Sequence, residues 1–600
     1  MTHDKKKRQD LGIFYTREEI VNFVYNILIL WKEKEDKEQN RWESHKPKHY
    51  PSVIDPACGE GIFLKKAVEK GFTKPDWIFG LDIDEAVVKK WPDISLLEEF
   101  GGDKEKLNAH FFHQNGLSPI RWEQHKKEYY GKLKKEDIKN EKFNLVVGNP
   151  PYGGVGIGIV TDDFEQALIN FEVWKRSFRK DSSANAEQMM LMETKEDKIR
   201  KNEKERLKNF PIEVLFIDRF IQLAKPGGWI AIIIPDGILS NSNLHYVRQY
   251  IADNAKVEAI VSLPRDAFKH VGTSAKTSIL FLKKKNPPTP PFVKGDSGGF
   301  DYPVFLASLE KLENGYLTEI LSQYKEFYMK QTLSKDKKVY SNDFVMVRVD
   351  KTLKEMMEEK PSSRWDAGYW QPQFTIADDF FKTIKYPVKR IEDFEIHLTY
   401  GPIVVRKKFI PQKTGILILN QTEIIFTGLD FSSPVFAKEN SPWVIERAMV
   451  KKNDIILARS GVGGVGKNKI TIVDKDINAC VGCFVDILRL EGINPYYVIT
   501  FWKGSYGWSQ IQKIINGVGT VNINFDEIKS IKIPVIPDHV QSHIESSYKK
   551  MAAFHDKAME ARAKGDEAVY KKNIETAEAM LKDLIARTEA VIRGEREDVV

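Results

Sequence analysis

One short segment of the chain carries groups suited to recognising a planar amino group. The apolar, strand-like run Phe143–Gly148 ends in Asn149-Pro150-Pro151-Tyr152. The amide oxygen of Asn149 and the carbonyl of Pro150 can each accept a hydrogen from an NH2 group, and the prolines make this backbone rigid. Tyr152 adds a ring face for stacking. The segment predicts contact with adenine N6, with cytosine N4 or a side-chain amide as alternatives, against the plainer reading of a proline-rich turn.

A second segment, about ninety residues earlier, predicts a cradle for a nucleotide-like ligand. A strand-like pair of residues leads into Asp55-Pro56-Ala57-Cys58-Gly59-Glu60-Gly61-Ile62-Phe63, and a helical pattern follows. Glycines let a ligand approach the backbone, and the N–H groups at a helix start are unpaired. The dinucleotide fingerprint is incomplete, because Leu64 occupies the place of its third glycine. No phosphate-loop lysine follows, so the segment is unsuited to a triphosphate.

Two more strand ends carry polar groups that suit a nucleoside. The strand-like Trp77 to Leu81 is followed by Asp82 and Ile83, about twenty residues past Gly61, where an acid can hold ribose hydroxyls. Asn115 follows another strand-like run and is a further candidate contact. The three polar strand ends predict one ligand site on an α/β sheet.

In the order of these motifs the chain resembles gamma-class N6-adenine DNA methyltransferases, which are related to the modification subunits of type I restriction systems. The resemblance begins at an N-terminal motif, Gly12 to Thr16, and implies S-adenosylmethionine as the cofactor. Two positions depart from the family pattern: Asn115 stands where an aspartate is usual, and Arg17 where a proline is common. The residues implied to bind the cofactor are Tyr15, Thr16, Asp55, Pro56, Ala57, Gly59, Gly61, Phe63, Asp82, Ile83 and Asn115.

The resemblance also implies a catalytic set. Asn149, Pro150, Pro151 and Tyr152 match the family tetrapeptide without a change. Because a duplex hides the amino group, the target adenine would be flipped out and stacked on Tyr152. Phe268, in a Leu-Pro-Arg-Asp-Ala-Phe segment, is the candidate second wall, with an ordinary core position as its alternative.

The expected fold is α/β, with a Rossmann-like methyltransferase sheet, a C-terminal α+β target recognition domain and terminal helices. The second half resembles part of a type I specificity subunit, from Arg364 through the β-rich run at 454–459 to Pro537. The boundaries that we expect are an N-terminal helical arm (1–45), a catalytic domain (46–285), a linker and connecting segment (286–363), a target recognition domain (364–542) and a helical segment (543–600). The Pro/Gly tract that begins at Asn286 sets the third of these boundaries.

The amino-acid composition is compatible with a cytoplasmic enzyme that acts on DNA, but it is not specific to that class. The 600 residues include 92 Lys and Arg against 85 Asp and Glu, so the formal net charge is only +7. The start lacks the apolar stretch of a signal peptide, and three cysteines make a disulfide framework implausible. We expect no metal, because Cys480 and Cys483 have zinc spacing but no second ligand pair and read better as strand.

Alternatives and partners remain open from the sequence. A protein-glutamine or RNA methyltransferase uses a similar tetrapeptide, and a non-catalytic DNA specificity component would keep the same cofactor fold. The first methyltransferase motif begins at Gly12, so we expect no preceding nuclease domain, and cleavage would require a partner restriction subunit. The expected partners are therefore duplex DNA and a restriction or specificity subunit, with no membrane.

Overall fold

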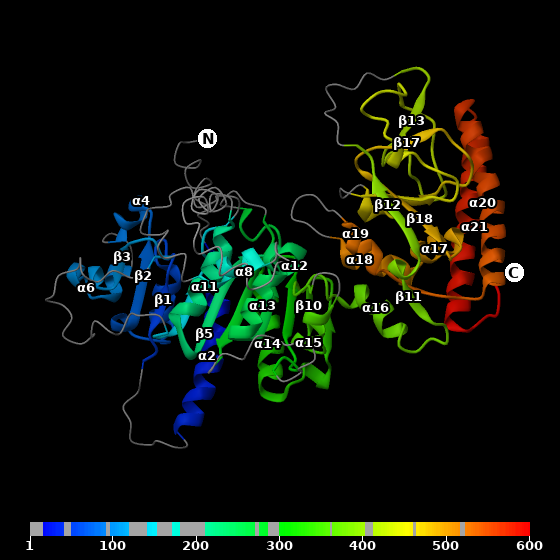
Figure 1. Ribbon diagram of the computed structural model, residues 1–600. Coiled ribbons are helices and arrows are strands. Elements are labelled where there is room, and N and C mark those ends of the chain that lie inside the picture. Colours follow the sequence, from blue (N-terminus) through cyan, green and yellow to red (C-terminus); the bar gives the residue numbers. More distant parts are fainter. Residues whose placement is uncertain are drawn as a thin grey trace, which may run out of the picture. The chain divides into compact units, whose positions relative to one another are not determined.

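A computed structural model describes residues 16–40, 50–91, 96–118, 141–152, 171–179, 210–269, 275–285, 299–359, 363–402, 412–459, 464–515 and 523–600. The chain divides into two compact units, Met1–Gly368 and Tyr369–Val600 (Figure 1). Each unit has its own sheets and helices, and each is described by itself.

A ten-stranded sheet forms the centre of the first unit, in the order β3-β2-β1-β4-β5-β7-β6-β8-β10-β9. The strands from β3 to β5 are parallel, and β7 lies antiparallel between β5 and β6. Long apolar runs favour such strands, because a central parallel strand is covered on both faces. The strands are β1 (Val53–Asp55), β2 (Ile78–Asp82), β3 (Phe111–His113), β4 (Phe143–Gly148), β5 (Ala224–Pro235), β6 (Ala255–Ser262), β7 (Thr277–Lys284), β8 (Phe305–Leu309), β9 (Val339–Ser341) and β10 (Val345–Arg348).

Along the chain, helices lie between many of the strands of this sheet (Figure 1). This topology confirms the predicted methyltransferase-type α/β fold. The helices of the unit are α2 (Glu18–Asn40), α3 (Ile62–Glu69), α4 (Glu85–Val88), α5 (Leu96–Glu99), α6 (Lys104–Asn108), α8 (Glu172–Arg179), α11 (Ile212–Leu223), α12 (Gly237–Ser240), α13 (His245–Asn254), α14 (Asn314–Lys330) and α15 (Leu353–Glu358).

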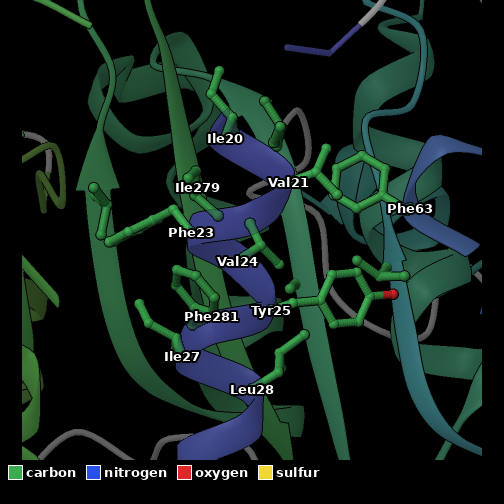
Figure 2. Close-up of a cluster of buried hydrophobic side chains, with 14 of the residues drawn as sticks. Ile20, Val21, Phe23, Val24, Tyr25, Ile27, Leu28, Phe63, Ile279 and Phe281 are labelled. Carbon is green, nitrogen blue, oxygen red and sulfur yellow. The ribbon is translucent and has the colours of Figure 1, made fainter. Parts of the chain in front are cut away.

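Helix α2 is embedded in the unit, whereas we expected an N-terminal arm. Figure 2 shows its apolar side chains directed both at Ile279 and Phe281 of β7 and at Phe63 of α3. The rings of Phe23 and Phe281 meet edge to face at 6.5 Å, and Trp31 donates a buried hydrogen bond to the hydroxyl of Tyr324, 2.7 Å away. Apolar residues on more than one face of a helix require burial on more than one side.

Residues 299–359 extend the sheet, although we expected a linker and connecting segment there. Strand β8 pairs with β6, and β10 and β9 continue the same sheet with α14 packed beside them. The expectation rested on the Pro/Gly tract, which lies outside the described residues for positions 286–298. A proline-rich tract ends one element without deciding whether the next strand joins the same sheet.

The second unit contains three small sheets and two long C-terminal helices. Its sheets have the orders β12-β18-β15-β16, β14-β13-β17 and β11-β19. Cys480 lies in β17, as its strand-like surroundings predicted. The elements are α16 (Pro372–Phe380), β11 (Val388–Arg390), β12 (Glu395–Tyr400), β13 (Ile416–Leu419), β14 (Phe436–Ala437), β15 (Ile455–Ala458), β16 (Ile470–Ile472), β17 (Ala479–Val481), β18 (Val485–Glu491), α17 (Pro495–Lys503), α18 (Ser505–Ile514), α19 (Phe525–Ser530), β19 (Lys532–Pro534), α20 (Asp538–Ala563) and α21 (Glu567–Arg593).

The two long helices, α20 and α21, lie side by side and form part of this unit (Figure 1). His555 of α20 is buried and bonds through Nδ1 to the hydroxyl of Thr427 (2.9 Å) and through Nε2 to the carbonyl of Leu429 (2.9 Å). A carbonyl only accepts, so Nε2 donates there and Nδ1 accepts from Thr427. These two hydrogen bonds therefore join helix α20, one of the expected C-terminal helices, to the β-rich part of the unit.

Candidate active site

The polar strand ends that the sequence singled out meet on one edge of the ten-stranded sheet. Strands β2, β1 and β4 are parallel neighbours, so their carboxyl ends lie together. Asp55 ends β1, Asp82 ends β2, and Asn149 follows β4. Ligands of open α/β sheets bind outside the carboxyl ends of the strands, and this edge is therefore the candidate active site.

The loop after β1 is held in a turn that needs glycine. Gly59 and Gly61 have φ values of 54° and 82°, a left-handed region that other residues rarely adopt. Asp82 accepts a hydrogen bond from the backbone N–H of Gly59 at 2.8 Å, and Trp91 donates to the carbonyl of Gly59 at 2.9 Å. Helix α3 begins directly after Gly61. A glycine loop that leads into a helix N-terminus is a backbone arrangement suited to a nucleotide-like ligand.

Asp55 lies under this loop in a fully buried position. Its Oδ1 accepts from the N–H of Ala57 at 3.0 Å. A Cβ atom at Gly148 would come within 2.5 Å of the same oxygen, so only glycine fits before Asn149. Burial raises the pKa of Asp55 to about 8, against the opposing hydrogen bond from Ala57, and Asp82 raises it further.

The two acids suit a cationic ligand. Burial also raises the pKa of Asp82, although its Oδ1 accepts from the N–H of Asp84 at 2.8 Å. A buried and a half-buried carboxyl group near each other favour a ligand that carries positive charge, because a cation would offset the cost of ionising both. S-adenosylmethionine bears a sulfonium and an ammonium group, and the carboxylate, glycine and backbone groups present here fit it.

We expect Asp55→Asn to raise the stability of the ligand-free protein at high pH. A carboxyl group whose pKa is about 8 in the folded chain and about 4 in the unfolded chain costs stability as the pH rises between those values. Asparagine has no such cost, so the difference in melting temperature between variant and wild type should grow from pH 5 to pH 8.5. Thermal unfolding across this range measures it, and parallel melting curves at every pH would contradict the assignment. The same variant should lose most of its stabilisation by S-adenosylmethionine.

Asn149 is held in one orientation by a residue far away in the sequence. Its Nδ2 donates to the hydroxyl oxygen of Thr16 at 3.1 Å. Thr16 is buried and precedes helix α2, whose packing on β7 and α3 determines where that end of the helix lies. With the nitrogen directed at Thr16, the amide oxygen takes the other side of the group. An amide in this orientation presents an acceptor, which is what an incoming amino group requires.

We expect Thr16→Val to slow methyl transfer while leaving cofactor affinity nearly unchanged. Valine has the same shape but cannot accept from Asn149, so the amide can turn over and present nitrogen. The loss of about one hydrogen bond from the reacting arrangement should lower kcat roughly tenfold. Thr16→Ser keeps the hydroxyl and is the matched control. A large rise in the dissociation constant for S-adenosylmethionine, with kcat unchanged, would instead assign Thr16 to cofactor binding alone.

The expected aromatic walls are both buried. Tyr152 is 1% exposed, and burial raises the pKa of its hydroxyl although a hydrogen bond with Asn149 opposes the shift. Pro150 is buried and Pro151 half-buried beside it. Phe268 has no exposed surface and packs in the main hydrophobic cluster with Leu263 and Ala267. Tyr152 is equally buried, so Phe268 stays the predicted second wall, with a core position as its alternative.

The side chain of Asn115 stabilises its own loop. Its Oδ1 accepts from the N–H of Leu117 at 3.0 Å, which closes a local turn. The loop is tied down by Arg219 of α11, a buried residue that donates to the carbonyls of Gly116 (2.9 Å) and Ser118 (3.1 Å). Burial lowers the pKa of Arg219 to about 10. The Asn115 oxygen keeps a second lone pair, so both ends of its amide can still contact a cofactor.

Several polar residues near this edge were missed from the sequence. Arg219 has no local signal, because an arginine in a helix is ordinarily exposed. Asp236, which follows β5, accepts from Ser278 (2.6 Å) and Ser262 (3.3 Å) and lies 3.6 Å from the ammonium of Lys276. These partners come from the ends of β6 and β7 and are brought together only by the sheet order. Of the other expected cofactor residues, Phe63 is buried and Ile83 is exposed, and Tyr15 lies outside the described residues.

The geometry agrees with a family match that covers most of the first unit. Residues 2–348 match the family described as N-6 DNA Methylase. The chain belongs to this family. The match begins before Thr16 and ends within the ten-stranded sheet, so it spans every strand end of the candidate site. It confirms the family resemblance that the sequence motifs indicated.

Curated and solved relatives of this methylase are distant. The type I restriction enzyme EcoEI methylase subunit of Escherichia coli is 22% identical over 294 residues, which are 47% of this chain and 45% of that protein. The chain spans less than half the length of the curated relatives that it matches.

Two solved structures extend the comparison beyond the catalytic part. The type IIG restriction endonuclease BpuSI is 14% identical and aligns with 97% of this chain and 67% of its own, at a TM-score of 0.43. A type I S subunit from M. genitalium is 14% identical and aligns with 30% of this chain and 42% of its own, at a TM-score of 0.22.

Within the described residues, none of the helices is both long and apolar enough to cross a membrane. In the same part of the chain, no three His, Cys, Asp or Glu side chains are grouped as a metal site.

Proposed function

We propose that the chain transfers a methyl group from S-adenosylmethionine to adenine N6 at specific sites in duplex DNA, as the modification activity of a restriction-modification system. The observation that carries the proposal is the orientation of Asn149, whose amide nitrogen donates to Thr16 beside a loop with one buried and one half-buried acid, Asp55 and Asp82. Family membership supports the choice of adenine in DNA over a protein amide or an RNA base.

The chain's own groups would act mainly by positioning. S-adenosylmethionine supplies, when bound, a methyl group on a positively charged sulfur. The Asn149 oxygen and the Pro150 carbonyl would accept the two N6 hydrogens and direct the nitrogen lone pair at that methyl. Such acceptors also stabilise positive charge that develops on the nitrogen, and they cost no reorganisation at the moment of reaction. Tyr152 would stack on the flipped base, which offsets part of the cost of unstacking it.

We assign site recognition to the second unit and DNA as the partner of both units. A restriction or specificity subunit is proposed as a further partner, by analogy with the systems to which the relatives belong. We place this activity in the cytoplasm, where DNA and S-adenosylmethionine are both present.

Single-molecule sequencing of DNA treated with the purified chain and S-adenosylmethionine tests the proposal. It should report N6-methyladenine at one sequence context, whereas labelled methyl groups found only in protein or RNA would refute it. A duplex with 2-aminopurine at the target position should become brighter on binding if the base leaves the stack.

A further inference from the structure

One end of the four-stranded sheet in the second unit brings together aromatic and charged side chains. Strand β12 ends at Tyr400, β18 begins near Asp486, and β15 ends just before Arg459. Tyr400 is the cross-strand partner of Asp486, which is in turn the partner of Leu457 in β15. Directly paired residues lie on the same face of a sheet, so these side chains share one face at this end.

The guanidinium of Arg459 lies against two neighbouring aromatic rings, whose centres are 5.9 Å apart. Its guanidinium carbon lies 4.2 Å from the centre of the Tyr400 ring and 5.3 Å from that of Phe525. A second arginine, Arg447, lies 5.0 Å from the same tyrosine ring and bonds to the hydroxyl of Thr399 and the carbonyl of Tyr400, each at 2.8 Å. Stacking uses the faces of a guanidinium and leaves its N–H groups, which lie in the plane, to make hydrogen bonds.

The same sheet contains a closed arginine–aspartate pair that serves as an internal comparison. Arg489 and Asp454 are joined by two hydrogen bonds, Nε to Oδ1 at 2.7 Å and Nη2 to Oδ2 at 2.8 Å. The backbone N–H of Lys451 also donates to Asp454 at 2.7 Å. The side chain of Arg489 is 27% exposed and that of Asp454 is 0% exposed. This pair satisfies its own donors and acceptors.

The pair Arg459 and Asp486 has the same exposure but an open geometry. The two side chains are again 27% and 0% exposed, yet their closest approach, Nη1 to Oδ1, is 3.5 Å. Among the described residues, neither the carboxylate oxygens of Asp486 nor Nη1 of Arg459 has a hydrogen-bond partner. Leaving such groups unsatisfied costs stability, so this pair is poorly explained as a structural bond. These three atoms are themselves buried, so a ligand could reach only the remaining N–H groups of Arg459, whose side chain is 27% exposed.

We propose that Arg459 reads a guanine in the DNA target, with Tyr400, Phe525 and Asp486 holding its guanidinium in place. The inference rests on the proposed function, because it assumes that the second unit binds DNA. A stacked guanidinium presents a planar fork, which matches two kinds of paired acceptor in DNA: the O6 and N7 atoms of guanine and the oxygens of a phosphate.

The buried carboxylate of Asp486 favours guanine over phosphate as the partner of Arg459. A phosphate contact depends on net positive charge, and Asp486 offsets the charge of Arg459 at 3.5 Å. Binding to a guanine edge depends more on the orientation of the donor groups than on their charge. The two rings and Asp486 fix the orientation of the Arg459 guanidinium. Exposed Arg447, which has no aspartate partner among the described residues, is the better phosphate contact of the two.

Selection of bound duplexes from a random library tests the inference on the full chain, without relying on methylation. The comparison is made at pH 8, because burial raises the pKa of Asp486 to about 7. Wild type should enrich a motif that contains a guanine, and Arg459→Lys should reduce preference for one guanine about 5- to 150-fold while sparing the other positions. Arg489→Lys, the matched control, should leave the motif unchanged.

In the selection with Arg459→Lys, either of two results would overturn the inference. One is a motif that Arg459→Lys leaves intact. The other is a uniform loss of affinity for all sequences with a salt dependence reduced by about one ion, which is the behaviour of a phosphate contact. If Arg459→Lys does not fold by thermal unfolding, Asp486→Asn decides, because it keeps the arginine and removes only its orienting charge. A position-specific loss then supports the inference, and an intact motif overturns it.

The outcomes separate this inference from the proposed function. Sequence-selective binding that depends on Arg459, without any adenine methylation, would refute the methyltransferase proposal and leave the guanine contact standing. Site-specific methylation that is indifferent to Arg459→Lys would refute the guanine contact alone. A wild-type chain that enriches no sequence would overturn the inference.

Discussion

Asn149→Ala should abolish detectable methyl transfer while the protein still binds S-adenosylmethionine with near wild-type affinity. The substitution removes the acceptor that Thr16 holds in place, and it leaves Asp55, Asp82 and the glycine loop untouched. Removing one preorganised hydrogen-bonding group from a reaction centre costs at least about a hundredfold in kcat. Transfer of labelled methyl to duplex DNA measures the rate, and calorimetry measures the cofactor affinity.

Asn144→Ala provides the matched control on the same strand. Its amide oxygen accepts from the backbone and hydroxyl of Ser52, at 3.2 and 3.0 Å, at the opposite end of β4. Its loss should lower stability modestly and leave kcat unchanged. If Asn149→Ala keeps full activity, or if both variants lose activity equally, the catalytic assignment is wrong.

Exchange of residues 369–600 for the corresponding unit of a relative should redirect methylation to a new sequence context and leave the modified atom unchanged. Sequence is read by side chains that reach base edges, whereas every residue of the proposed catalytic set belongs to the first unit. Methylation profiles of the chimera, obtained by single-molecule sequencing, report both the base and its context. A chimera that folds and still modifies the original sequence would place recognition in the first unit or in a partner.

The structure decides where this exchange must be made. We expected a recognition domain at 364–542, but Ser363 and Trp365 are bonded to the first unit, through Arg248 (2.8 Å) and the carbonyl of Leu239 (2.9 Å). A junction after Gly368 keeps those bonds. The exchanged segment must include the C-terminal helices, because His555 of α20 bonds to Thr427 and Leu429 in the same unit.

The sequence alone determined the family, the sheet type and the local motifs of this protein. Asp55 to Gly61 and Asn149 to Tyr152 are recognisable because the turn and the amide site each consist of consecutive residues. Apolar runs likewise indicate strands, and the 3.6-residue period after Pro537 indicates helices, since both signals are local. The polar ends of β1, β2 and β4 could be assigned to one site because parallel strands share an edge.

Only the tertiary structure decided which distant residues complete the sites. Thr16 and Asn149 are 133 positions apart, and Arg219 reaches the loop of Asn115 from another helix. No period or motif encodes such contacts, because they depend on how α2 and α11 pack on the sheet. The same reason explains why 299–359 joins the sheet and why Phe268 is buried. The sequence also does not distinguish the two arginine–aspartate pairs. Arg489 and Asp454 are hydrogen-bonded at 2.7 Å, whereas Arg459 and Asp486 approach only to 3.5 Å. Differences of tenths of an ångström decide whether a hydrogen bond forms, and only the folded structure sets them.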